Sequence, residues 1–211
     1  DTLHIELMAA AERLRELAEW EAATQALQEL NEGDLLLLDG SLHSPSHYGH
    51  EVLTSLVRQA TPQGVGILGV SKRSALSLHS MPLLPALEHS GHLAGLQGSW
   101  AYPLHELLPI RSAGEVWAFR HHPTTPAFRI DIGGDLEPLS ALARLGGYCR
   151  DILYPGYPFP LAQIHNQVFL GAQEGRDLIQ SLQSRALAAG LPPGAWQVLF
   201  ADFHAVLDRS V

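Results

Sequence analysis

Cysteine is nearly absent from this sequence, because Cys149 is the single cysteine among 211 residues. One cysteine cannot form an internal disulfide or a Cys-rich zinc site, and such usage is typical of a reducing cytoplasm. Apolar runs long enough to cross a bilayer, roughly 20 residues, are also absent. The first segment, DTLHIELMAAAERLRELAEW, carries charges throughout, which a signal peptide does not. We therefore expect a cytoplasmic protein that does not associate with membranes.

Positive charge is scarce as well. Thirteen Lys and Arg residues face 22 Asp and Glu residues, giving a net charge of −9 with neutral histidines. This balance argues against a protein that binds nucleic acid through a basic face alone. It does not exclude an enzyme that binds phosphates through metal ions, or one whose partner protein supplies the positive charge.

Several familiar signatures are missing. The sequence has no P-loop, no GxGxxG, no HRD, no GxSxG and no HExxH, and its twelve histidines are scattered. A Ser-His-Asp hydrolase therefore cannot be assembled from recognisable motifs. The chain also starts at Asp1 without an initiator methionine, which leads us to expect a fragment or a processed form.

The first third of the chain alternates between helical and strand-like segments. Residues 7–30 contain no Gly or Pro and predict a long helix, and residues 47–60 predict a second one. The leucines at 35–38 predict a strand buried on both faces, as in the centre of a sheet. Residues 65–72, VGILGVSK, predict another buried strand. This order predicts an α/β fold with helices packed on a sheet.

The rest of the chain is less regular. EVWAFRHHP and AFRIDIGG alternate partly between apolar and polar residues and predict an antiparallel pair, whereas residues 79–104 predict a loop with a short helix. We expect Asp135 to cap a following helix, and the apolar segment 195–209 to dock on the body. The length suits one domain, so residues 1–211 are predicted to form a single domain.

Residues whose side chains could take part in catalysis or binding follow both predicted buried strands. Asp39 ends the leucine run and begins Asp-Gly-Ser, so it either marks a site at the carboxyl edge of the sheet or closes the strand with a common turn. Lys72 and Arg73 end the second strand. They either meet a phosphate or form a solvated strand end.

The predicted first helix carries acids directly before Asp39. Glu21 falls on the apolar face of its first half, and Glu19 falls on the apolar face of its second half. Either carboxylate could turn inward, where it would need a cation or another partner. Helical geometry alone does not choose between them.

The segment YPGYPFPLAQIH holds three prolines in six residues, which stiffen the approach to a helix. One interpretation is a rigid helix start with Tyr157 packed on the core. The functional interpretation is that His165 binds a metal or a phosphate and that Tyr157 hydrogen-bonds the same group.

In order along the chain, RELAEWEAA, LLLLDGSL, GVSKRS and YPGYPFPLAQIH resemble the NurA family of DNA-end-processing nucleases. The resemblance runs from about Arg13 to Gln173, and the ordered set is more specific than any single motif. It implies an RNase H-like mixed sheet flanked by helices and a manganese-dependent nuclease, a 5′–3′ exonuclease and single-strand endonuclease. It also implies a homodimer, associated with the nucleoid, that works with the hexameric HerA translocase in double-strand-break end resection and homologous recombination.

The resemblance also implies site residues. The family's metal-binding acids would fall on Asp39 and on Glu19, or less well on Glu21, and its Tyr and His on Tyr157 and His165. EWEAA looks like the family's acid followed by an aromatic residue, which favours Glu19. Hard carboxylates suit Mn²⁺, with Mg²⁺ as the other choice, and His165 would complete the site or contact the phosphate.

One departure from the family bears on activity. Members usually carry an earlier strand ending in another Asp-Gly-Ser, whose Asp also binds metal, and apart from Asp1 no candidate precedes residue 7. We therefore expect a fold that lacks its N-terminal strands. The departure keeps open a non-catalytic NurA-like subunit that docks on the translocase. The acidic composition is also consistent with an unrelated small-molecule hydrolase or binding protein.

Overall fold

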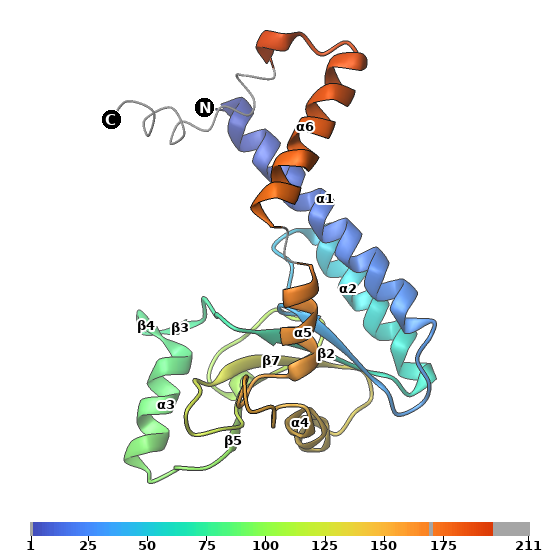
Figure 1. Ribbon diagram of the computed structural model, residues 1–211. Coiled ribbons are helices and arrows are strands. Elements are labelled where there is room, and N and C mark those ends of the chain that lie inside the picture. Colours follow the sequence, from blue (N-terminus) through green and yellow to red (C-terminus); the bar gives the residue numbers. More distant parts are fainter. Residues whose placement is uncertain (1, 169–170, 196–211) are drawn as a thin grey trace, which may run out of the picture. The chain divides into compact units, whose positions relative to one another are not determined.

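The computed structural model describes residues 2–168 and 171–195, so the predicted docking segment at 195–209 lies almost entirely outside the described residues (Figure 1). The chain divides into two compact units. One is Glu12–Asn166, and the other combines Asp1–Ala11 with Gln167–Val211. None of the helices in the described ranges is both long and apolar enough to cross a membrane.

Five strands form one mixed sheet in the order β1-β2-β7-β6-β5. Figure 1 labels β2, β7 and β5 of this sheet. Their bounds are β1 Leu35–Asp39, β2 Gly66–Ser71, β5 Trp100–Pro103, β6 Glu115–Arg120 and β7 Phe128–Gly133. β1 and β2 run parallel and the other neighbours run antiparallel, which confirms the predicted β6–β7 pair. β3 Ser77–Leu78 and β4 Met81–Pro82 form a separate two-stranded ribbon.

Helices flank the sheet, as the sequence predicts. They are α1 Thr2–Leu27, through its C-terminal part, α2 His47–Ala60, α3 Leu83–Leu93, α4 Pro138–Gly147 and α5 Phe159–Gln167, with short 3₁₀ turns η1 Thr61–Gln63 and η2 Leu104–Glu106. The helix α6 Ala172–Ala188 belongs to the other unit. The predicted Asp135 cap is wrong. Glu137 caps α4 instead, because Pro138 begins the helix and the Glu137 carboxylate accepts the next two free N–H groups.

β1 corrects a second prediction, because it lies at the edge of the sheet and its leucines are only partly buried. Leu35 and Leu37 pack on one face, and Leu36 and Leu38 pack on the other. The four-leucine run therefore reflects apolar cover on both faces of the strand. It does not reflect a central position, which needs a neighbour on each side.

The two faces of the sheet have separate cores. One core contains Leu68, Val70 and Ile130 together with residues of α4 and α5, and the other contains Ile67 together with residues of α1 and α2. Side chains alternate between faces along a strand. Asp39 follows Leu37 by two residues, so it belongs to the face covered by α4 and α5.

Candidate active site at the ends of the first two strands

The structure brings together three residues that the sequence marks for chemistry. Asp39 is the last residue of β1 and lies in register with Val70 of β2, and Lys72 follows the end of β2. Lys72 Nζ donates to Asp39 Oδ2 at 3.0 Å. The same Nζ lies 5.2 Å from the centroid of the Tyr157 ring. A carboxylate, an ammonium group and a phenol therefore meet at the carboxyl edge of two parallel strands.

The charged members of this group are open to solvent. The Asp39 and Lys72 side chains are 49% and 41% exposed. An exposed ion pair of this kind contributes about 0–1 kcal/mol to stability. Burial by itself lowers the pKa of Lys72, but the Asp39 carboxylate and the Tyr157 hydroxyl outweigh it and raise that pKa overall. Lys72 therefore carries its positive charge at neutral pH, where a ligand can reach it.

Tyr157 combines the two roles that its sequence context suggests. Its ring packs edge-on against Phe128, with centroids 5.5 Å apart, on the core under α4. Its hydroxyl is buried and, in the part of the chain that the structure describes, makes no hydrogen bond of normal geometry, an arrangement that costs about 1–3 kcal/mol. Burial, and then the charge of Asp39, raise the Tyr157 pKa against the opposing effect of Lys72. The hydroxyl therefore stays protonated and can donate to a bound group.

The loop before α5 fixes the position of Tyr157. Gly156 adopts a φ of 81° and donates its N–H to the Cys149 carbonyl at 2.8 Å, and Phe159 N–H donates to the Tyr148 carbonyl at 2.9 Å. Cys149 is buried in the same core, and burial raises the pKa of its thiol to about 12. This thiol is therefore a packing group and not a nucleophile.

The chain leaves β1 in a tight path over β2. Gly40 has a φ of 140° and donates its N–H to the Val70 carbonyl at 2.9 Å. A Cβ at Gly69 would lie 2.7 Å from Gly40 O and 3.0 Å from Leu42 N. Only glycine leaves room for this crossing at position 69, so the Asp-Gly-Ser turn and the glycine of GILGV form one unit.

The remaining predicted site residues lie outside this group. Glu19 is exposed and accepts a hydrogen bond from Arg15 at 2.5 Å, and Glu21 is exposed and accepts one from Gln25 at 3.4 Å. Arg73 and His165 are exposed, and in the described part of the chain neither makes a hydrogen bond or ion pair with Asp39. Neither helix carboxylate is turned into the core.

The structure brings together only part of the set of metal ligands that the sequence predicts, among the residues it describes. Asp39 offers an exposed carboxylate of the kind that Mn²⁺ and Mg²⁺ prefer. Among the described residues, however, no three His, Cys, Asp or Glu side chains are placed to hold a metal ion together. These residues do not form a complete site by themselves, so Glu19, Glu21 and His165 as ligands stay predictions.

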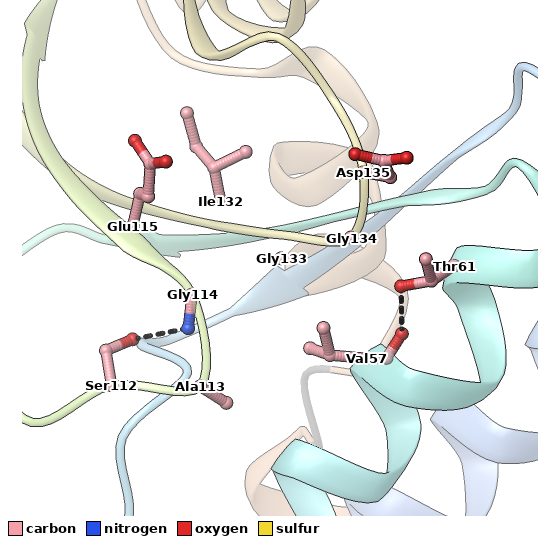
Figure 2. A pocket seen from close by; sticks show the side chains of 10 residues that line it. All are labelled: Val57, Thr61, Ser112, Ala113, Gly114, Glu115, Ile132, Gly133, Gly134 and Asp135. Carbon is pink, nitrogen blue, oxygen red and sulfur yellow. Dashed lines mark hydrogen bonds between the residues drawn. The ribbon is translucent and has the colours of Figure 1, made fainter.

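A cavity of about 480 Å³ lies elsewhere, where β7 ends and β6 begins (Figure 2). Ser112 Oγ accepts the Gly114 N–H there at 3.2 Å, and Glu115 and Asp135 stand on its two sides in Figure 2. Its lining includes none of the three residues grouped at the end of β1. The hollow is therefore separate from the candidate site.

Sequence reasoning missed a charged pair inside the sheet. Arg129 Nε and Nη2 donate to Asp131 Oδ1 and Oδ2 at 2.6 and 2.7 Å, and the two side chains are 8% and 0% exposed. The signal was available, because FRIDIG places two charges inside an otherwise apolar strand. A charge at a buried strand position needs a partner.

No family model matches the sequence, and no curated protein matches it. Among solved structures, the chain is similar to the NurA nuclease from Sulfolobus solfataricus, with a TM-score of 0.55, 19% identity, and coverage of 87% of this chain and 70% of that one. It also matches human ENDOV, with a TM-score of 0.44, 20% identity, and coverage of 72% and 62%. The similarity to the NurA nuclease shows that the chain has a mixed α/β fold of that type. The resemblance noted in the sequence is confirmed at the level of the fold.

Proposed function

We propose that this protein is a metal-dependent nuclease that hydrolyses phosphodiester bonds of DNA at Asp39. The observation that carries the proposal is the meeting of Asp39, Lys72 and Tyr157 at the ends of two parallel strands. The NurA-type fold supports the reaction class. The finer proposal is a 5′–3′ exonuclease and single-strand endonuclease that resects double-strand breaks.

The three residues divide the chemistry between them. The Lys72 ammonium binds a phosphate oxygen, which places positive charge at one point of a chain with net charge −9. The Tyr157 hydroxyl, which makes no hydrogen bond to any described residue, donates to the phosphate or orients the attacking water. Asp39 provides a hard carboxylate donor for Mn²⁺ or Mg²⁺. When bound, such an ion supplies charge stabilisation and an activated water.

The other predicted ligands belong to the same proposal. Glu19, or Glu21 in its place, would add a second carboxylate, and His165 would complete the site or contact the scissile phosphate. Calorimetric titration of Mn²⁺ into Glu19→Gln, Glu21→Gln and His165→Ala variants tests each assignment. A substitution that leaves the affinity for Mn²⁺ unchanged removes that residue from the ligand set.

The decisive experiment is cleavage of end-labelled single-stranded and duplex DNA across a Mn²⁺ titration. Asp39→Asn should lower the rate by at least about a hundredfold, because several kcal/mol of charge stabilisation would be lost. Asp34→Asn is the matched control. Asp34 lies just before the other end of β1, where its carboxylate accepts the Asn31 N–H. Near-normal cleavage by Asp39→Asn would refute the proposal.

A second candidate is a non-catalytic subunit that docks on a HerA-type hexamer. It is favoured by the absence, among the described residues, of three grouped metal ligands, and by the pairing of Glu19 with Arg15. Failure to cleave any DNA with Mn²⁺ or Mg²⁺, together with co-purification with the hexamer, would select it. A homodimer is proposed in both cases, and light scattering of the purified protein tests it.

A further inference from the structure

We propose that the buried Arg129–Asp131 pair is a positioning device for Asp39 that acts through the backbone amide of Leu42. The inference rests on the proposed function, in which Asp39 carries the reaction. Among the described residues, neither member of the pair makes a hydrogen bond or an ion pair with Asp39. Their link to it is the short segment of chain that leaves β1 and crosses the sheet.

The Asp131 carboxylate accepts four hydrogen bonds. Besides the two bonds from Arg129, its Oδ2 accepts the Leu42 N–H at 3.0 Å and the Ser112 hydroxyl at 2.8 Å. Oδ2 thus accepts three of the four hydrogen bonds and Oδ1 accepts one. Three separate pieces of chain therefore converge on one buried anion: β7, the segment after β1, and the segment before β6.

This convergence holds the turn after Asp39 at two points. Gly40 N–H is bonded to β2 through the Val70 carbonyl, and Leu42 N–H is bonded to β7 through Asp131. The Leu42 carbonyl in turn accepts the Ala113 N–H at 2.9 Å. Both backbone groups of Leu42 are thereby fixed, and the direction in which the chain leaves Asp39 is set.

The pair and the candidate site lie on opposite faces of the sheet. Arg129 and Asp131 alternate along β7 with Ile130 and its neighbours, which pack toward α4 and α5. Leu42 is buried in the other core, with α1 and α2. Asp39 is on the α4 and α5 face with Tyr157. A change in the pair can therefore move Asp39 without altering any group that would touch DNA.

An ion pair at this place does something that apolar residues cannot do. Replacing a buried ion pair by apolar residues of similar size is often neutral or stabilising, so net stability does not require the charges. An apolar pair, however, has no acceptor for the Leu42 N–H. The specific contribution of Asp131 is thus the path of the Asp39 turn.

The test uses two variants that disturb the turn in different ways. Arg129→Met/Asp131→Leu replaces both charges and removes the acceptor. Gly69→Ala leaves the pair intact but pushes a Cβ against Gly40 O and Leu42 N. Gly91→Ala is the control, because a Cβ there meets nothing closer than 3.7 Å.

The double variant should keep a melting temperature near that of the wild type, because loss of two buried charges offsets the unpaired Leu42 N–H. Gly69→Ala should lower the melting temperature, because its Cβ would stand 2.7 Å from the Gly40 carbonyl oxygen. In both variants the Leu42 amide should lose its protection from hydrogen exchange. The kcat for DNA cleavage should fall roughly 10–100-fold, as for loss of other groups that orient a metal ligand. KM should change little, because the groups that bind DNA remain. The control should match the wild type in all of these measurements.

Loss of Leu42 protection with unchanged kcat would overturn the inference. If the double variant does not fold, the same comparison in Gly69→Ala decides. If the wild type cleaves no DNA, the proposed function fails separately. The inference is then judged by the ¹³C shift of the Asp39 carboxyl in the metal-free protein, and an unchanged shift in Gly69→Ala overturns it.

Discussion

Two aspartate–cation pairs lie in the same sheet and differ in almost everything except their chemistry. Asp39 and Lys72 are about half exposed and joined by one bond of 3.0 Å. Asp131 is completely buried and takes two bonds from Arg129. The exposed lysine can leave its partner for a ligand, because water compensates for the bond that is lost. The buried arginine cannot leave, because nothing would replace the bonds.

The kind of cation follows the same division. Arg129 uses the planar fork of its guanidinium to hold a carboxylate in one geometry, whereas Lys72 offers a compact charge on a flexible chain. Burial and side-chain type therefore indicate that the Arg129–Asp131 pair stabilises the structure, whereas the Lys72–Asp39 pair is available to bind a ligand. Substitutions can test this assignment on both sides.

The largest expected effect comes from breaking the buried pair. Asp131→Ala should lower the free energy of unfolding by about 3–5 kcal/mol, because it leaves Arg129 buried and uncompensated. Asp39→Ala, the matched change in the exposed pair, should cost at most about 1 kcal/mol. Urea denaturation followed by circular dichroism measures both values. Equal losses in the two variants would abolish the contrast between the pairs.

Removal of the Tyr157 hydroxyl should have an effect of intermediate size, on DNA cleavage and not on stability. Tyr157→Phe keeps the ring that packs on Phe128 and removes only the unpartnered hydroxyl. Stability should hold or rise slightly, since a buried hydroxyl without a partner is unfavourable. DNA cleavage should fall on the order of 10²-fold if the hydroxyl donates to the phosphate in the transition state. Full activity in steady-state assays would place this hydroxyl outside the reaction.

The smallest effect should follow removal of Lys72. Lys72→Met should change stability by about 1 kcal/mol or less and reduce the slope of log affinity against log salt for single-stranded DNA by about 1. Arg58→Met, which removes an exposed cation from α2, is the control. An equal change of slope in both variants would show that Lys72 acts only through net charge.

The raised pKa of Lys72 fixes the sign of the pH dependence of this pair. Its stabilising contribution is fully present below the ordinary lysine value of 10.5. It is lost as the pH rises above 10.5 and through the folded-state pKa. The difference in stability between wild type and Lys72→Met should therefore disappear at strongly alkaline pH.

Local patterns in the sequence predicted the parts of the fold that local physics decides. The helix at His47–Ala60, the β6–β7 pair and the place of Asp39 at a strand end all follow from composition, alternation and turn residues. The edge position of β1 does not, because an apolar run reports cover on the faces and not the number of neighbouring strands. β5, at Trp100–Pro103, was missed within a segment rich in Pro and Gly.

The anchor of the Asp39 turn was beyond local reasoning for a different cause. Asp131 meets Leu42 across 89 positions and Ser112 across 19, so no window of the sequence contains the site. The two charges in FRIDIG predict that each buried charged side chain has a partner, but they do not predict which residue that partner is. Helical periodicity likewise could not choose between Glu19 and Glu21, since both side chains are exposed.

Lys72 is the one lysine in the sequence, and every other basic side chain except histidine is an arginine. Its ε-amine is therefore the one lysine amine that a reagent can label. Reductive methylation with ¹³C-formaldehyde would label this side chain and the chain's α-amino group, which differ in chemical shift. The side-chain signal would report directly whether Asp39 is holding the lysine or has exchanged it for a metal or a phosphate. The labelled Lys72 amine thus gives an NMR signal at the site where the reaction is proposed to occur.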